Sequence, residues 1–201
     1  HETVLVAGGA GGVGSFAIPL MRYRGAGAII ATAGNDASRD HLINALGLDG
    51  DHIIDYKKLS LEQMEKRVRQ LTDGHGVAVA FDFAGGKMKK LCFSAVGFDG
   101  RIVSVVEESR DFDFNIWRAD ISPFFAKSGT YHFVALSARA RNGGPPDWDV
   151  YPHMMSELAA LVETQKISLP QATDLGELSE ETIREAHSLL QAGHVKGKLV
   201  L

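Results

Sequence analysis

The sequence has a single cysteine and no long apolar run, and these absences exclude several classes of protein. Cys92 has no second cysteine with which to form an intramolecular disulfide or a Cys-x-x-Cys zinc cluster. No window approaches the roughly 20 apolar residues that span a bilayer. The formal net charge of −4 supplies no basic surface for nucleic acid. We therefore expect no nucleic-acid or membrane partner, and we expect a small-molecule site in a cytoplasmic protein.

Motifs of several enzyme classes are also absent. The chain has no G-x-S-x-G nucleophile elbow and no G-x-x-x-x-G-K-[ST] phosphate loop, so the signatures of a hydrolase and a P-loop ATPase are missing. Its eight histidines form no H-E-x-x-H, and no tyrosine has a lysine four positions later. Asp82 is expected to cap a turn at a strand end, and His187 is expected to be an ordinary helix residue. The sequence therefore identifies no catalytic residue and no metal ligand.

A glycine-rich turn near the start is the most informative feature that the sequence does have. Residues 4–14 read V-L-V-A-G-G-A-G-G-V-G, an apolar run that leads into the spacing G-x-G-x-x-G before a helix-compatible stretch. In this spacing Gly9 allows a tight turn, Gly11 lets the backbone approach a pyrophosphate, and Gly14 permits close packing of helix on strand. Phosphates bind at such a helix N-terminus, where N–H groups and the helix dipole favour negative charge. The predicted cofactor contacts in this turn are Gly9, Gly11, Gly12, Val13 and Gly14.

Strands and helices alternate after this turn, which distinguishes it from a glycine-rich hairpin. Beyond the first strand, apolar runs predict strands at 28–33, 52–56, 77–83, 101–106 and 130–136, with helices at 15–24, 37–46, 60–71 and 88–96. We expect an α/β fold over residues 1–168: a doubly wound parallel six-stranded Rossmann sheet with helices on both faces. Ligands are expected at the carboxyl ends of the strands.

The rest of the chain predicts further helices and a short strand. A helix at 148–164 has an apolar stripe that we expect to face the core, made up of Met154, Met155, Leu158, Leu161 and Val162. Residues 169–201 are expected to form a C-terminal tail with a helix and a strand. In this tail Ser179 has the chemistry of an N-cap, and the helix that follows is expected to run to about Gln191 before Gly193 ends it.

The end of the second predicted strand bears on the choice of cofactor. An NAD-binding fold usually places Asp or Glu there to hold the ribose 2′-hydroxyl, whereas this chain has Gly34. Without that carboxylate a 2′-phosphate meets no repulsion, and Asn35 and Arg39 could supply a donor and a positive charge. We therefore expect NADP(H) in preference to NAD(H). The alternative is that Arg39 is a solvated helix residue and that Asp36 turns inward.

Several further segments support a resemblance to a known family. These are I-A-T-A-G-N at the second strand, D-H-I-I-D-Y-K at the third, G-H-G-V-A-V-A-F-D-F-A-G-G around the fourth, G-R-I-V-S-V at the fifth, and the ending E-A-H-S-L-L-Q-A-G-H-V-K-G-K-L-V-L. Together with the glycine turn, they resemble the medium-chain dehydrogenase/reductase superfamily, in its quinone-oxidoreductase-like and zinc-type alcohol dehydrogenase-like branch. The resemblance extends over nearly all 201 residues.

The resemblance implies further contacts with the cofactor. It places Arg39 near the 2′-phosphate and Tyr56 near the adenosine. Lys198 resembles a basic residue that reaches the pyrophosphate, although a solvated lysine on a surface strand is an equal alternative. The loops expected to flank the cofactor hold Ala84, Gly85 and Val105, and the residues expected to present backbone groups to the nicotinamide carboxamide are Phe133, Val134 and Ala135.

Members of this superfamily also have a GroES-like catalytic domain, which lies upstream of the part that this chain matches. By the resemblance, that domain holds the substrate pocket and, in zinc-dependent branches, the metal ligands. We therefore expect no zinc on this chain and no activity from this chain alone. Residues 169–201 resemble the segment that returns to the GroES-like domain, so we expect either exposed apolar surface or an altered packing of this tail in the structure.

The expected function is that of an NADP(H)-binding domain of an oxidoreductase that transfers hydride to or from a carbonyl, enone or quinone. The alternatives are a nucleotide-binding or sensing module without catalysis, an NAD(H)-dependent alcohol dehydrogenase, and a methyltransferase, which would place an acidic residue where Gly34 lies. The apolar sixth strand, 131–136, could form a sheet edge that pairs with a second copy in a homodimer, unless the helix at 148–164 covers it.

Overall fold

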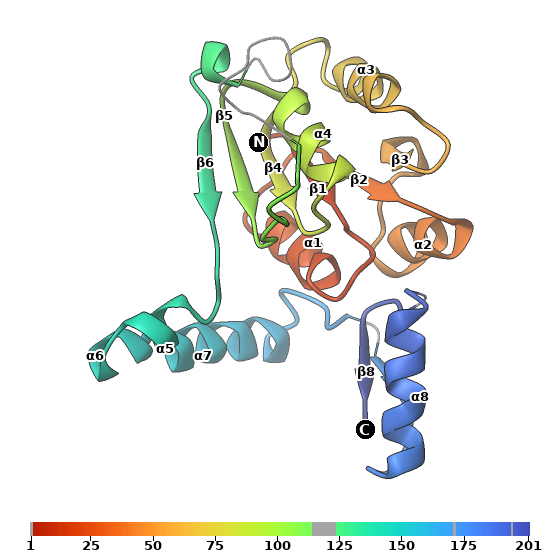
Figure 1. Cartoon of the computed structure of the whole chain (residues 1–201), viewed down its shortest axis with the longest axis vertical. Helices are drawn as coiled ribbons and strands as arrows, with labels where there is room; N and C mark the ends of the chain where they lie inside the picture. The colour runs from red at the N-terminus through yellow and green to blue at the C-terminus, as the bar shows by residue number, and fades with distance from the viewer. Residues whose placement is uncertain (1, 114–123, 171, 194) are drawn as a thin grey trace.

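The computed structural model describes residues 2–113, 124–170, 172–193 and 195–201, and its centre is a parallel sheet (Figure 1). The six strands lie in the order β3-β2-β1-β4-β5-β6, which is the doubly wound arrangement that the sequence predicts. All five neighbouring pairs are parallel. Their bounds are β1 (Val4–Ala7), β2 (Ile29–Ala33), β3 (Ile53–Asp55), β4 (Val77–Asp82), β5 (Val96–Ser104) and β6 (Thr130–Phe133).

Helices cover both faces of the sheet because successive residues of a strand point to opposite sides. Leu5 of β1 packs in a cluster with residues of α3 and α4, whereas its neighbours Val4 and Val6 pack with residues of α1 and of the segment after α2. The helical elements of this part are α1 (Gly14–Tyr23), α2 (Asp36–Asp40), a π-helical turn η1 (His41–Ala45), a 3₁₀ turn η2 (Gly50–His52), α3 (Leu61–Leu71) and α4 (Lys87–Ala95).

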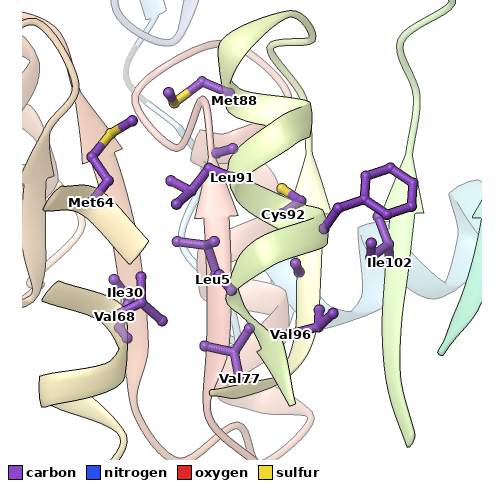
Figure 2. Packing of buried hydrophobic residues seen from close by; sticks show 14 of the residues in the cluster. Leu5, Ile30, Met64, Val68, Val77, Met88, Leu91, Cys92, Val96 and Ile102 are labelled. Atoms are coloured by element: carbon purple, nitrogen blue, oxygen red, sulfur yellow. The ribbon is translucent and has the colours of Figure 1, made fainter. Parts of the chain in front are cut away.

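The core on the α3 and α4 face is built from large aliphatic side chains (Figure 2). Leu5, Ile30 and Leu91 are completely buried, and each fully buried side chain of this size contributes about 1.5–3 kcal/mol. Cys92 lies among them with no exposed surface. Burial raises the pKa of the Cys92 thiol well above its ordinary value, since a thiolate there would have no water around it.

The chain beyond β6 is arranged differently from the sequence prediction. The sixth strand ends at Phe133, and a helix that was not predicted, α5 (Ala138–Asn142), follows it. The predicted helix at 148–164 is formed as α6 (Pro145–Trp148) and α7 (Val150–Glu163). The remaining elements are η3 (Phe125–Lys127), β7 (Ala172–Asp174), α8 (Glu180–Gln191) and β8 (Lys198–Val200).

The expectation that α7 faces the core is wrong. None of its residues is buried, and Met155 of the expected stripe is 64% exposed. Figure 1 shows α5–α7 lying beyond the carboxyl end of β6, away from both core clusters. An apolar stripe predicts which face of a helix avoids water, but not which surface covers it. The exposed apolar surface expected of residues 169–201 is also present, since Leu178 is 72% exposed and Leu190 is 59% exposed.

The C-terminal tail forms the predicted helix and strand. β7 and β8 pair in parallel as a separate two-stranded sheet. The Ser179 hydroxyl caps α8 by accepting a hydrogen bond from the Thr182 amide at 3.1 Å, as the sequence predicts. Among the described residues, no helix is long and apolar enough to cross a membrane.

Candidate functional site

The glycine turn joins β1 to α1, and backbone conformation or backbone contacts restrict side chains at Gly8 and Gly14. The backbone of Gly8, rather than that of Gly9, takes the left-handed conformation, with a φ of +86°. A Cβ at Gly14 would lie 2.5 Å from backbone atoms of Gly8 and Gly9. Glycine at position 14 therefore lets the start of α1 lie close to the backbone of the turn, and its predicted role in packing helix on strand stays a prediction.

Gly11 differs from its neighbours because no atom of the described residues would clash with a side chain there. A Cβ built there would have its nearest described contact, the Gly8 carbonyl oxygen, at 3.5 Å, which is ordinary van der Waals distance. The backbone of Gly11 is not left-handed either. The bare backbone at Gly11 therefore faces space that a ligand could use, as a dinucleotide-binding turn requires.

The end of β2 is closed to side chains by an aromatic ring. A Cβ at Gly34 would lie 2.3 Å from the Tyr56 hydroxyl oxygen and 2.5 Å from the ring carbon that bears it. The Asp or Glu of an NAD-binding fold therefore does not fit there unless the Tyr56 ring moves. The structure thus places Gly34 and Tyr56, which the sequence assigned separately, in direct contact.

Asn35 and Arg39 both have structural partners. Asn35 caps α2, since its side-chain oxygen accepts a hydrogen bond from the Ser38 amide at 2.8 Å. The Arg39 guanidinium donates to the carbonyl oxygens of Gly50 at 2.8 Å and Ile53 at 3.4 Å. These bonds tie α2 to the segment that leads into β3, so both side chains hold local structure.

A pocket of about 200 Å³ lies between the glycine turn and the end of β2. Gly11, Gly34 and Tyr56 line it, so three of the predicted residues come together there, whereas Arg39 is not among the lining residues. The pocket lies at the carboxyl ends of β1 and β2. This is the position at which a doubly wound sheet binds a nucleotide.

The C-terminal segment returns to the glycine turn. A Cβ at Gly12 would lie 2.8 Å from the Lys198 ammonium nitrogen and 3.1 Å from the Gly197 carbonyl oxygen. Lys198 is thus beside the turn to which the resemblance assigned it. Its contact with a pyrophosphate stays a prediction.

The turn after β4 is held by a buried carboxylate. Asp82 is completely buried, and one of its oxygens accepts hydrogen bonds from the amides of Gly85 at 2.7 Å and Ala84 at 3.3 Å. The other oxygen accepts a bond from the Ser104 hydroxyl at 2.7 Å. The interpretation of Asp82 as a turn cap is confirmed, and its carboxylate fixes two residues predicted to flank the cofactor.

A buried ion cluster that the sequence analysis missed joins the ends of β4 and β5. The Lys89 ammonium donates to the Val106 carbonyl oxygen at 2.7 Å and lies 3.1 Å from Glu108 and 3.6 Å from Asp82. The Glu108 carboxylate also accepts a hydrogen bond from the Gly86 amide at 2.8 Å. Burial alone would lower the pKa of Lys89, but the hydrogen bond to Glu108 and nearby negative charges outweigh it and raise that pKa. Lys89 is buried, whereas Lys87 is exposed and Lys90 is half-buried. Nothing in the sequence distinguishes these lysines of α4, so sequence alone gives no signal for the role of Lys89.

A larger cavity, of about 910 Å³, opens beside this cluster at the carboxyl ends of β5 and β6. The amide of Val134 donates to the Ser104 carbonyl oxygen at 2.9 Å, which keeps the segment after β6 against β5. The predicted nicotinamide-side residues that line the cavity are Val105, Phe133, Val134 and Ala135. Within the described ranges, no three His, Cys, Asp or Glu side chains gather as metal ligands would.

Comparison with protein families identifies the chain. The family model for zinc-binding dehydrogenases matches residues 48–201. The chain belongs to this family. It has the fold of the cofactor-binding domain of medium-chain dehydrogenases and reductases, as the sequence resemblance implied.

A curated relative matches the whole chain but is far longer. The squalestatin tetraketide synthase of Phoma sp. (strain C2932) is 31% identical over 200 residues, which cover 100% of this chain and 7% of the synthase. The chain therefore corresponds to a small part of that protein.

Solved structures share the fold over nearly all of the chain and about half of their own length. A quinone oxidoreductase of Pseudomonas syringae has a TM-score of 0.75 and 24% identity, covering 98% of this chain and 55% of that chain. A mycobacterial protein in complex with NADPH has a TM-score of 0.72 and 23% identity, covering 98% and 56%. The apo JamJ enoyl reductase has a TM-score of 0.71 and 20% identity, covering 98% and 54%.

Proposed function

We propose that this nucleotide-binding domain prefers NADP(H) and presents it for hydride transfer in a larger oxidoreductase. The observation that carries the preference is the contact between Gly34 and the Tyr56 ring, which leaves no room for a carboxylate at the end of β2. A ribose 2′-phosphate would therefore meet no negative charge from that position. The NADPH complex of a structurally similar mycobacterial protein supports the same choice.

The pyrophosphate would lie at the N-terminus of α1. The first turn of a helix has amides without carbonyl partners, and these amides attract phosphate oxygens. The bare backbone of Gly11 leaves room for the phosphates, and the Lys198 ammonium beside Gly12 could neutralise part of their charge. None of these roles requires a side chain from α1.

The nicotinamide would lie in the large cavity at the ends of β5 and β6. Backbone groups of Val134 and Ala135 would hold its carboxamide, and Val105 would pack on the ring. When bound, the cofactor supplies the hydride, while the protein sets the orientation of the ring. The Lys89–Glu108 pair would act indirectly, by keeping the turn after β4 and the segment after β5 at a fixed separation.

The proposed substrates are carbonyl, enone or quinone compounds. The similar proteins described above, a tetraketide synthase, a quinone oxidoreductase and an enoyl reductase, support this range. We propose that catalytic residues and any zinc ligands belong to a GroES-like domain to which residues 169–201 lead. The chain by itself would then bind cofactor without turnover, and the whole protein would be cytoplasmic.

Calorimetric titration with NADPH and NADH separately tests the proposal. We expect NADPH to bind about tenfold or more tightly than NADH. Preference for NADH would support the NAD(H)-dependent alcohol dehydrogenase alternative. Binding of NADPH, together with failure of the whole protein to oxidise it with any carbonyl, enone or quinone, would support a sensing module. Absence of binding to both nucleotides would overturn the proposal.

A further inference from the structure

The pocket at the end of β2 has one charged residue in its described lining, and that residue comes from the opposite end of the chain. Lys196 lies between α8 and β8 and lines the same pocket as Gly11, Gly34 and Tyr56. Its side chain is partly buried, and its ammonium makes no hydrogen bond or ion pair within the described ranges. A cation held in a pocket without a protein partner favours an anionic ligand.

Two hydroxyl groups of the pocket also have no hydrogen-bond partner among the described residues. Ser38 lines the pocket and is only 8% exposed, yet its hydroxyl makes no hydrogen bond to any described residue. Tyr56 is half-buried and lines the pocket, and its hydroxyl likewise makes no hydrogen bond within the described ranges. A buried hydroxyl such as that of Ser38 costs free energy when it has no partner, and both hydroxyls are positioned to bond a ligand in the pocket.

The guanidinium that the sequence assigned to the 2′-phosphate is turned to other partners. Arg39 donates hydrogen bonds to the carbonyl oxygens of Gly50 and Ile53, and it does not line the pocket. Moving it to the pocket would leave those carbonyls without these donors. Lys196 requires no such exchange.

We infer that Lys196, with the hydroxyls of Ser38 and Tyr56, binds the 2′-phosphate of NADP(H). This inference rests on the proposed function and adds to it the residue that determines cofactor preference. A phosphate monoester brings nearly two negative charges and three acceptor oxygens, which match one ammonium and two hydroxyl donors. The charge that determines cofactor preference thus comes from Lys196 in the C-terminal segment rather than from Arg39 of α2.

Nucleotide titrations of Lys196→Gln test the inference. We expect this variant to lose about tenfold or more in affinity for NADPH and for adenosine 2′-monophosphate, and to keep its affinity for NADH. Lys196→Arg should restore most of the loss, since it restores the charge. Lys166→Gln is the matched control, because Lys166 is an exposed lysine outside the pocket lining and the variant has the same net charge.

The outcomes separate this inference from the proposed function. If the parent protein prefers NADPH and Lys196→Gln keeps that preference while Arg39→Ala loses it, Arg39 holds the phosphate and the inference is wrong. An equal loss for NADPH and NADH in Lys196→Gln would also overturn it. If the parent protein binds neither nucleotide, the proposed function itself fails.

Discussion

Helices α4 and α7 show how one kind of sequence pattern leads to two different environments. Both have apolar residues at helical spacing, yet seven residues of α4 are buried and none of α7 is. α4, which connects β4 to β5 in the chain, lies against the sheet, whereas α7 lies beyond the end of β6 (Figure 1). The hydrophobic period of a helix therefore predicts its apolar face, and tertiary position decides whether that face is covered.

The largest effect on stability is expected from truncating a buried side chain of α4. Leu91→Ala should lower the free energy of unfolding by about 2–5 kcal/mol, because Leu91 is completely buried and a cavity would remain. Met155→Ala on α7 should change it by less than about 0.5 kcal/mol. Urea denaturation of both variants measures the difference. Equal losses would show that α7 packs against the core in solution.

Two alanine substitutions in the glycine turn should separate stability from binding. Gly14→Ala should destabilise the protein by about 1–3 kcal/mol, since its Cβ would lie 2.5 Å from backbone atoms of the turn. Gly11→Ala should leave the midpoint of thermal unfolding nearly unchanged and weaken NADPH binding. Thermal melts and calorimetry on both variants check this pair. Full NADPH affinity in Gly11→Ala would mean that no ligand approaches that backbone.

The buried Lys127 should make the stability of the protein depend on pH. Burial, with a smaller contribution from Arg69, lowers the pKa of Lys127 from 10.5 to about 8, so between these values the unfolded chain binds more protons than the folded one. Lys127 should therefore make stability rise with pH in this window. The Lys127→Met variant should lack that rise in the free energy of unfolding. Urea denaturation of the variant and the parent protein at pH 7 and pH 9.5 measures this. An unchanged slope would contradict the lowered pKa.

The smallest effect on the fold of a single chain is expected at the exposed end of β6. We propose that this edge pairs two copies in a homodimer, because β6 lies at the edge of the sheet and Phe133 is 76% exposed. Phe133→Lys should shift the protein from dimer to monomer in light scattering at micromolar concentration, with little change in thermal stability. A monomeric parent protein would remove the proposal.

Most of the sheet could be predicted from sequence because each strand is a short apolar run next to a turn. Ile29–Ala33 is buried along its whole length and reads as such. The need for glycine at position 14 followed from spacing alone, since the clash that it avoids lies within the same turn. Such features depend on residues close in the chain.

The remaining parts of the site depend on residues that are distant in the chain. Nothing in the sequence near Lys89 indicates that Glu108 lies 3.1 Å away. Likewise, the carbonyl partners of Arg39 and the place of Lys196 in the pocket appear only once α2 and the C-terminal segment are folded. The periodicity of apolar residues predicts helices and strands, but it does not indicate which charged side chains those helices and strands bring together.

The single buried cysteine, Cys92, allows opening of the core to be followed by chemical labelling. Because the Cys92 thiol has no exposed surface and a raised pKa, a thiol-reactive reagent reaches it only when the packing of α4 on the sheet opens. The labelling rate of Cys92 would therefore report opening of the core without any added probe. A cysteine introduced at the surface could be modified selectively beside it.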